Sequence, residues 1–217
     1  SARQMAPWLA SPYVEDGRKV LIGGPGRPSL LDQITTILPV KKVEDLVLGS
    51  SSFDRALDGL KKLEATSKSK PVCIVQAEHA EMDGQVVRRL GRAVEWRPFV
   101  DPYPKEKRKR KDVRAHAKVF IFGHGKTETC VFGSANASAP ALDSTNTEAV
   151  VILPPRPKGE IVKHLGLGDS ISAQSVQGDL IQKQWKDSAD DPDAKYDCLL
   201  SAVAAAEFGY RLTLAAG

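Results

Sequence analysis

The sequence predicts an α/β fold in which a layered, mixed β-sheet carries helices on both faces. From residue 19 onward, short β-branched or apolar runs alternate with segments of helical periodicity, and three apolar runs follow one another after residue 115. The 217 residues are 41% hydrophobic and 27% charged, which is typical of a globular protein and excludes a disordered or coiled-coil chain. At about 150 residues per domain, this length predicts one compact domain with an appendage.

Seven runs rich in β-branched and apolar residues are predicted to be strands. They cover residues 18–22, 43–48, 71–76, 94–97, 117–122, 129–132 and 149–153. The segments between the first four have the apolar spacing of helices, predicted over 28–38, 54–64 and 81–90. Ser29 opens the first helix, and Asp54 is placed to cap the second.

A proline-rich stretch at residues 154–157 marks the end of this unit. We therefore expect one domain over residues 1–157, with an N-terminal extension, and a helical C-terminal segment over 158–217. Because the chain begins at Ser1 and ends just after a strand-like run, we expect a piece of a longer protein whose C-terminal segment leads into a further domain.

The cysteines and the absence of long apolar runs in the sequence predict a cytoplasmic location. Cys73, Cys130 and Cys198 are far apart and form no C-x-x-C motif, which favours buried thiols in a reducing compartment. The sequence has neither a run of about 18 apolar residues nor a signal-like N-terminus. We therefore expect no membrane as a partner.

The charge of the chain is concentrated in one segment. The net charge is only +4, with 31 basic and 27 acidic residues. Residues 105–114, however, include seven basic residues and only two acidic ones, Glu106 and Asp112. The segment is either a solvated loop or a phosphate-binding element. The residues predicted to contact nucleic acid are Lys107, Arg108, Lys109, Arg110, Lys111 and Arg114.

Three short motifs follow this basic segment, and together they predict one chemical site. On a strand, residues two apart point the same way, so His116 and Lys118 are expected to share one face. Ser134 and Asn136 follow the next strand on a turn whose backbone amides are free to bind an anion. Glu148 heads the third strand, within reach of an imidazole.

At these residues the sequence resembles the phospholipase D superfamily, whose signature is H-x-K-x4-D-x6-G-S-x-N. The matching residues are His116, Lys118, Gly133, Ser134 and Asn136. Gly123 stands at the aspartate position, and the interval between Lys118 and the glycine is three residues longer than the pattern. Both departures resemble the relaxed motif of tyrosyl-DNA phosphodiesterases and of phospholipase-D-type restriction endonucleases, in which the aspartate is dispensable. The resemblance therefore points toward a nucleic-acid substrate.

The resemblance also implies a role for each residue. His116 would attack phosphorus and become a phosphohistidine, and a second histidine would protonate the leaving oxygen and then activate water. The nonbridging oxygens would be held by Lys118, Ser134 and Asn136. Glu148 would accept the other ring N–H of a catalytic histidine. Residues 50–52 end a strand near the expected substrate edge, and no cofactor or metal is called for.

The superfamily's active site needs two units of the full motif, and this sequence has a single H-x-K…G-S-x-N unit. A twofold homodimer would supply the second unit by placing His116 of each subunit across the axis. A missing part of the full-length protein is the other source, and the sequence leaves the two open.

The sequence thus predicts a metal-independent phosphodiesterase, a DNA nuclease that is part of a larger bacterial protein and is of the defence type. RNA is left open as the substrate. One alternative is a hydrolase of phospholipids or other small phosphodiesters, although the sequence shows no interfacial amphipathic helix. Another is a catalytically degenerate module that only binds nucleic acid.

Overall fold

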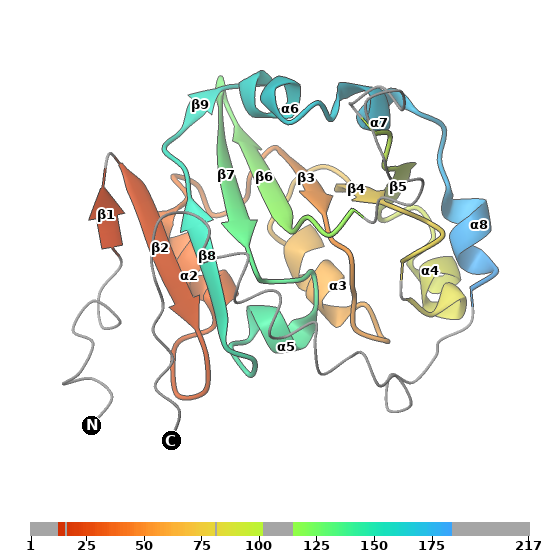
Figure 1. The fold of residues 1–217 in the computed structure, drawn as a ribbon, viewed down its shortest axis with the longest axis horizontal. Coiled ribbons are helices and arrows are strands. Elements are labelled where there is room, and N and C mark those ends of the chain that lie inside the picture. The colour runs from red at the N-terminus through yellow and green to blue at the C-terminus, as the bar shows by residue number, and fades with distance from the viewer. Residues whose placement is uncertain (1–12, 16, 81, 102–114, 184–217) are drawn as a thin grey trace, which may run out of the picture. The chain divides into compact units, whose positions relative to one another are not determined.

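The structure is a computed structural model that describes residues 13–15, 17–80, 82–101 and 115–183. In this part of the chain, a nine-stranded sheet has the order β1-β2-β8-β7-β6-β3-β4-β5, and β9 pairs with β7 (Figure 1). The strands are β1 (Tyr13–Glu15), β2 (Arg18–Gly23), β3 (Asp45–Gly49), β4 (Val72–Val75), β5 (Glu95–Pro98), β6 (Val119–His124), β7 (Thr127–Gly133), β8 (Glu148–Ile152) and β9 (Arg156–Pro157).

The sheet is mixed, as predicted. Strands β3, β4 and β5 are parallel to one another, whereas the pairs from β1 through β2, β8, β7 and β6 to β3 are antiparallel. The described helices are α2 (Leu30–Ile37), α3 (Asp58–Glu64), α4 (Gly84–Leu90), α5 (Ala139–Leu142), α6 (Glu160–His164), α7 (Gly168–Ser172) and α8 (Gln177–Ile181). Because β3, β4 and β5 are parallel, α3 and α4 serve as their crossover connections.

Alternate residues of β6 face two different cores, so both faces of the sheet are covered. Phe120 and Phe122 belong to the larger core, to which α2, α3, α4, α5 and α8 contribute. Ile121 belongs to the smaller core on the other face, together with Ile161 of α6. This alternation explains why β6 has no polar residue between Val119 and Phe122, and it confirms the prediction of helices on both faces.

All seven predicted strands are present, and the structure adds the short strands β1 and β9. The helix predicted over 54–64 begins only at Asp58, as α3, although Asp54 caps its N-terminus as predicted. The Asp54 carboxylate accepts hydrogen bonds from the backbone N–H groups of Asp58 and Gly59, at 2.7 and 2.9 Å. It also accepts one from the N–H of Ala139, at 2.8 Å. The Asp54 carboxylate therefore binds the N-termini of both α3 and α5.

Residues 158–183 form α6, α7 and α8, which pack against the sheet as part of the same compact unit. The Glu128 carboxylate of β7, only 3% exposed, accepts hydrogen bonds from the N–H groups of Gly159 and Ile161 and so fixes the start of α6. The division at residue 157 stays a prediction, and residues 184–217 lie outside the described part of the chain.

Cys73 and Cys130 are buried and free, as the sequence predicts, and Cys198 lies outside the described residues. Burial raises the pKa of both thiols, that of Cys130 to about 12 with help from the nearby Glu128 charge. Among the described helices, none is both long and apolar enough to cross a membrane.

Candidate active site

The predicted site residues gather at one edge of the sheet, where β6 and β8 begin and β3, β4 and β7 end. The N–H of Gly133 donates to the carbonyl of Lys118 at 3.2 Å, and the N–H of Ser134 donates to the carbonyl of Ala149 at 3.0 Å. The antiparallel register of β6, β7 and β8 thus aligns three motifs that are separated in sequence. The prediction that His116 and Lys118 stand on a strand is wrong in one respect: β6 begins only at Val119, and the pair lies in the segment leading into it.

Lys118 and His116 are in direct contact. The Lys118 side chain is only 7% exposed, and its Nζ lies 2.6 Å from Nε2 of His116. The same Nζ donates to Oγ of Ser51 at 3.2 Å. Because an ammonium only donates, the ring nitrogen must accept, which places the imidazole proton on Nδ1. Nε2 of His116 therefore holds a lone pair, beside a fixed positive charge, on an exposed residue.

Glu148 and Ser134 form a second pair behind this contact. The Ser134 hydroxyl donates to Oε2 of Glu148 and accepts from the N–H of Ala149, at 3.0 Å for the latter bond. Glu148 is 9% exposed, and this burial raises its pKa, against the opposing effects of the Ser134 hydrogen bond and the Lys118 charge. The single hydroxyl proton of Ser134 is thus directed to Glu148. The contact predicted between Ser134 and a substrate oxygen stays a prediction, and so does the contact predicted between Glu148 and a histidine.

The loop after β3 lies against both halves of the motif. Ser50 donates to the Ser52 carbonyl at 2.7 Å and accepts from the N–H of Ala137 at 3.0 Å. The Ser50 hydroxyl also approaches Oδ1 of Asn136, at 3.4 Å. Residues 50–52 therefore belong to the site, where the sequence places them.

Two further residues of the site were missed by the sequence analysis. Oε1 of Gln76, at the end of β4, accepts from the N–H of Ala115 at 2.7 Å and so holds the segment that carries His116. His79 lines a small cavity together with Ser50, Ser51, Gln76, Ala80 and Ala115. The sequence could have indicated both residues, because they follow the carboxyl end of β4, and the carboxyl ends of neighbouring parallel strands meet at one edge of a sheet.

Gly123, at the motif's aspartate position, pairs with Asp45 on the neighbouring strand β3. A Cβ at Gly123 would lie only 2.4–2.7 Å from the Asp45 carboxylate, which thus fills the space of the missing side chain. Asp45 is in turn paired with Nζ of Lys158 at 2.8 Å. Gly123 is five residues along from Lys118, which corresponds to roughly 16 Å of strand. The departure therefore removes no group from the reacting end of the site.

Restoring the motif aspartate is expected to destabilise the protein rather than activate it. Gly123→Asp should have a free energy of unfolding about 0.2–1 kcal/mol lower than Gly123→Asn, because two carboxylates would then face each other across β3 and β6. Chemical denaturation of both variants measures the difference. It should shrink in an Asp45→Asn background. Equal stability of the two variants beside Asp45 would show that the Asp45 carboxylate does not occupy this position.

The six residues predicted to contact nucleic acid are not among those that the structure describes. Residues 102–114, which include the six predicted nucleic-acid contacts Lys107, Arg108, Lys109, Arg110, Lys111 and Arg114, lie outside the described part of the chain. Within the described ranges, no group of three or more His, Cys, Asp or Glu side chains is arranged to hold a metal ion.

Comparisons with known proteins add solved structures of low identity. No protein-family model and no curated protein matches the chain. A yeast tyrosyl-DNA phosphodiesterase is 14% identical over 68% of this chain and 36% of its own, with a TM-score of 0.42. Nuc from Salmonella typhimurium, a phospholipase D family member, is 15% identical over 68% of this chain and 89% of its own, with a TM-score of 0.39.

A polyphosphate kinase from Porphyromonas gingivalis is 16% identical over 95% of this chain, with a TM-score of 0.44. The chain spans about a third of the length of the yeast phosphodiesterase and of this kinase, at 36% and 31%. The resemblance to the phospholipase D superfamily therefore rests on the motif and on the way the sheet assembles it.

Proposed function

We propose that the chain is a metal-independent phosphodiesterase that cleaves DNA through a phosphohistidine on His116. The contact of 2.6 Å between Nε2 of His116 and the buried Nζ of Lys118 is the observation that supports this best. It provides a neutral imidazole with its lone pair on Nε2, beside the cation that a phosphoryl oxygen requires. The buried thiols of Cys73 and Cys130 fit a reducing compartment such as the cytoplasm.

The proposed reaction has two displacements at phosphorus. In the first, a phosphoryl oxygen takes over the hydrogen bond from Lys118, Nε2 of His116 forms a bond to phosphorus, and the ester P–O bond breaks. The leaving oxygen takes a proton from a second, protonated histidine. In the second, that histidine removes a proton from water, the water oxygen bonds to phosphorus, and the P–N bond breaks. The Asn136 amide donates to a nonbridging oxygen in both steps.

Nucleic acid is the proposed substrate because of the charge next to the site. The basic segment 105–114 leads directly into Ala115 and His116 in sequence. Neutralising phosphates with Lys and Arg is the main source of affinity for DNA. A lipid substrate would call instead for an interfacial amphipathic helix or exposed apolar loops, and the sequence shows neither.

Cleavage of DNA is expected to persist in excess EDTA, since a histidine nucleophile and a lysine cation replace the roles of a metal. The purified protein would be incubated with labelled single-stranded DNA, duplex DNA, RNA, phosphatidylcholine vesicles and bis-p-nitrophenyl phosphate. An end-labelled strand attached to the protein, stable in alkali and labile in acid, would identify the phosphohistidine. Loss of cleavage with chelator and its return with magnesium would refute the mechanism, and cleavage of vesicles alone would refute the substrate.

A homodimer is the proposed source of the second histidine, with His116 of the partner subunit acting as the acid. Mixing wild type with an equal amount of inactive His116→Ala protein, under exchange, should then lower activity to about one quarter, since only wild-type pairs have both groups. A second motif elsewhere in a longer protein would instead lower it by half. The measurement is activity against the fraction of variant at constant total protein.

A further inference from the structure

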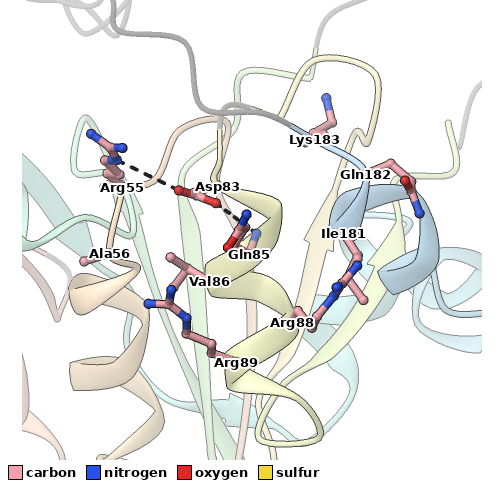
Figure 2. Close-up of a pocket in the computed structure, with 10 residues that line it drawn as sticks. All are labelled: Arg55, Ala56, Asp83, Gln85, Val86, Arg88, Arg89, Ile181, Gln182 and Lys183. Carbon is pink, nitrogen blue, oxygen red and sulfur yellow. Dashed lines mark hydrogen bonds and ion pairs between the residues drawn. The ribbon is translucent and has the colours of Figure 1, made fainter.

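A second cationic surface lies outside the reacting pair. A hollow of about 770 Å³ opens between α4, the residues just after α8, and the loop that precedes α3 (Figure 2). Four basic residues line it: Arg55 from the loop, Arg88 and Arg89 from α4, and Lys183 after α8. We call this surface the α4 hollow.

The α4 hollow has an excess of positive charge. Asp83 is the one carboxylate among the described residues that line it. The Asp83 side chain already accepts from the N–H of Gln85 at 2.8 Å, as the N-cap of α4, and lies 3.9 Å from Arg55. The Arg55 side chain is 65% exposed, so this ion pair contributes little and leaves the guanidinium accessible. Four cations against one committed carboxylate make the hollow a site for an anion with several charges.

The α4 hollow adjoins the candidate active site. Arg55 is four residues after Ser51, which contacts Lys118, and Asp83 is four residues after His79, which lines the cavity beside Ala115. Four residues span at most about 14 Å. Both loops leave the carboxyl ends of parallel strands, β3 and β4, and therefore leave at the same edge of the sheet.

The side of the hollow formed by Lys183 is held to the segment between β4 and α4. The N–H of Gly84 donates to the carbonyl of Lys183 at 3.1 Å, and Nζ of Lys183 donates to the carbonyl of Glu78 at 3.4 Å. Figure 2 shows Arg88 beside Ile181, whereas Arg55 and Arg89 lie on the other side of α4. The cations are therefore spread over the width of the hollow instead of enclosing a single small anion.

We propose that the α4 hollow binds backbone phosphates of a nucleic-acid strand whose reacting phosphate lies at His116. This inference rests on the proposed function and adds a length requirement to it. Separated arginines on an open surface suit successive phosphates of one strand, each bound in turn by a forked guanidinium. Strands long enough to reach from His116 to α4 are then bound more tightly than shorter ones, whereas a small phosphodiester does not reach the hollow.

Binding by a triple variant, Arg55→Gln, Arg88→Gln and Arg89→Gln, tests this proposal. Both the triple variant and its parent would carry His116→Ala, so that strands stay intact, and binding of labelled oligonucleotides of increasing length would be followed by fluorescence anisotropy at several salt concentrations. The slope of log affinity against log salt is expected to flatten by about 0.7 to 0.9 per lost phosphate contact. The gain in affinity with strand length is expected to shrink.

A matched control removes the same charge from the opposite edge of the sheet. Lys41, Lys42 and Lys68 are exposed and precede β3 and β4, so Lys41→Gln, Lys42→Gln and Lys68→Gln should keep the parent's slope and length dependence. If the salt slope flattened equally in both triple variants, DNA binding would depend only on net charge, and the proposal would be overturned. An unchanged slope in the arginine variant would overturn it as well. Failure of the parent to bind any oligonucleotide, with hydrolysis of bis-p-nitrophenyl phosphate intact in wild type, would instead refute nucleic acid as the substrate.

Discussion

His116→Ala is expected to lower kcat by about a thousandfold or more, because the variant lacks the atom that would form the covalent bond to phosphorus. The neighbouring Nζ of Lys118, 2.6 Å away, does not replace it in the proposed mechanism, because an ammonium has no lone pair with which to attack phosphorus. The measurement is single-turnover cleavage of a labelled strand in EDTA, together with the yield of acid-labile protein adduct.

Folding should be unaffected in this variant. His116 is exposed in the segment before β6, so its removal leaves no cavity in either core. His164→Ala provides a matched control, since His164 is an exposed histidine at the end of α6. Thermal unfolding should be alike in wild type and both variants, and only His116→Ala should lose the adduct. Activity within about tenfold of wild type would mean that another residue is the nucleophile.

Lys118→Met is expected to lower kcat by about 100-fold to 1,000-fold, with a smaller change in KM, since the lost charge acts mainly on the transition state. Methionine is unbranched like lysine and one atom shorter, so it keeps most of the buried stem while it removes the charge and the donors. The variant also loses the donor to Nε2 of His116, so the ring is no longer held in the tautomer that has its lone pair on Nε2.

Ser51→Ala separates these effects from general damage to the site. It removes one of the acceptors of the Lys118 ammonium, at 3.2 Å, but leaves the charge in place. We therefore expect a loss of less than about tenfold for Ser51→Ala. Steady-state kinetics on bis-p-nitrophenyl phosphate and on an oligonucleotide would show whether kcat or KM changes. Equal losses in Lys118→Met and Ser51→Ala would contradict a role for the charge itself.

Most of the fold was predictable because its signals are local. The seven predicted strands are runs rich in β-branched and apolar residues, and the sheet buries them either on both faces, as in β6, or on alternate residues, as in β8. Strand β9 was missed because it is two exposed residues long, and only its pairing with β7 makes it a strand. The start of α3 was placed too early because Leu57 has a left-handed backbone, with φ of 55°, so the helix begins only after it.

The sequence by itself identified the candidate pair, His116 and Lys118, and the neighbours that share its motif. Residues two apart on a strand point the same way, so the sequence predicts that His116 and Lys118 share one face, and the structure brings them into contact in the segment before β6. The hydroxyl at 134 and the carboxylate at 148 follow from the two strands next in order, and the structure brings them together.

Only the tertiary structure decided what surrounds that pair. The order of the sheet places β3 between β6 and β4, which brings Ser51 to Lys118 and Gln76 to Ala115. The same order sets the Asp45 carboxylate at the position left open by Gly123. The α4 hollow likewise combines cations from three separate segments. Each of these contacts joins residues far apart in the chain, and such contacts depend on strand order and register, which no local pattern of side chains specifies.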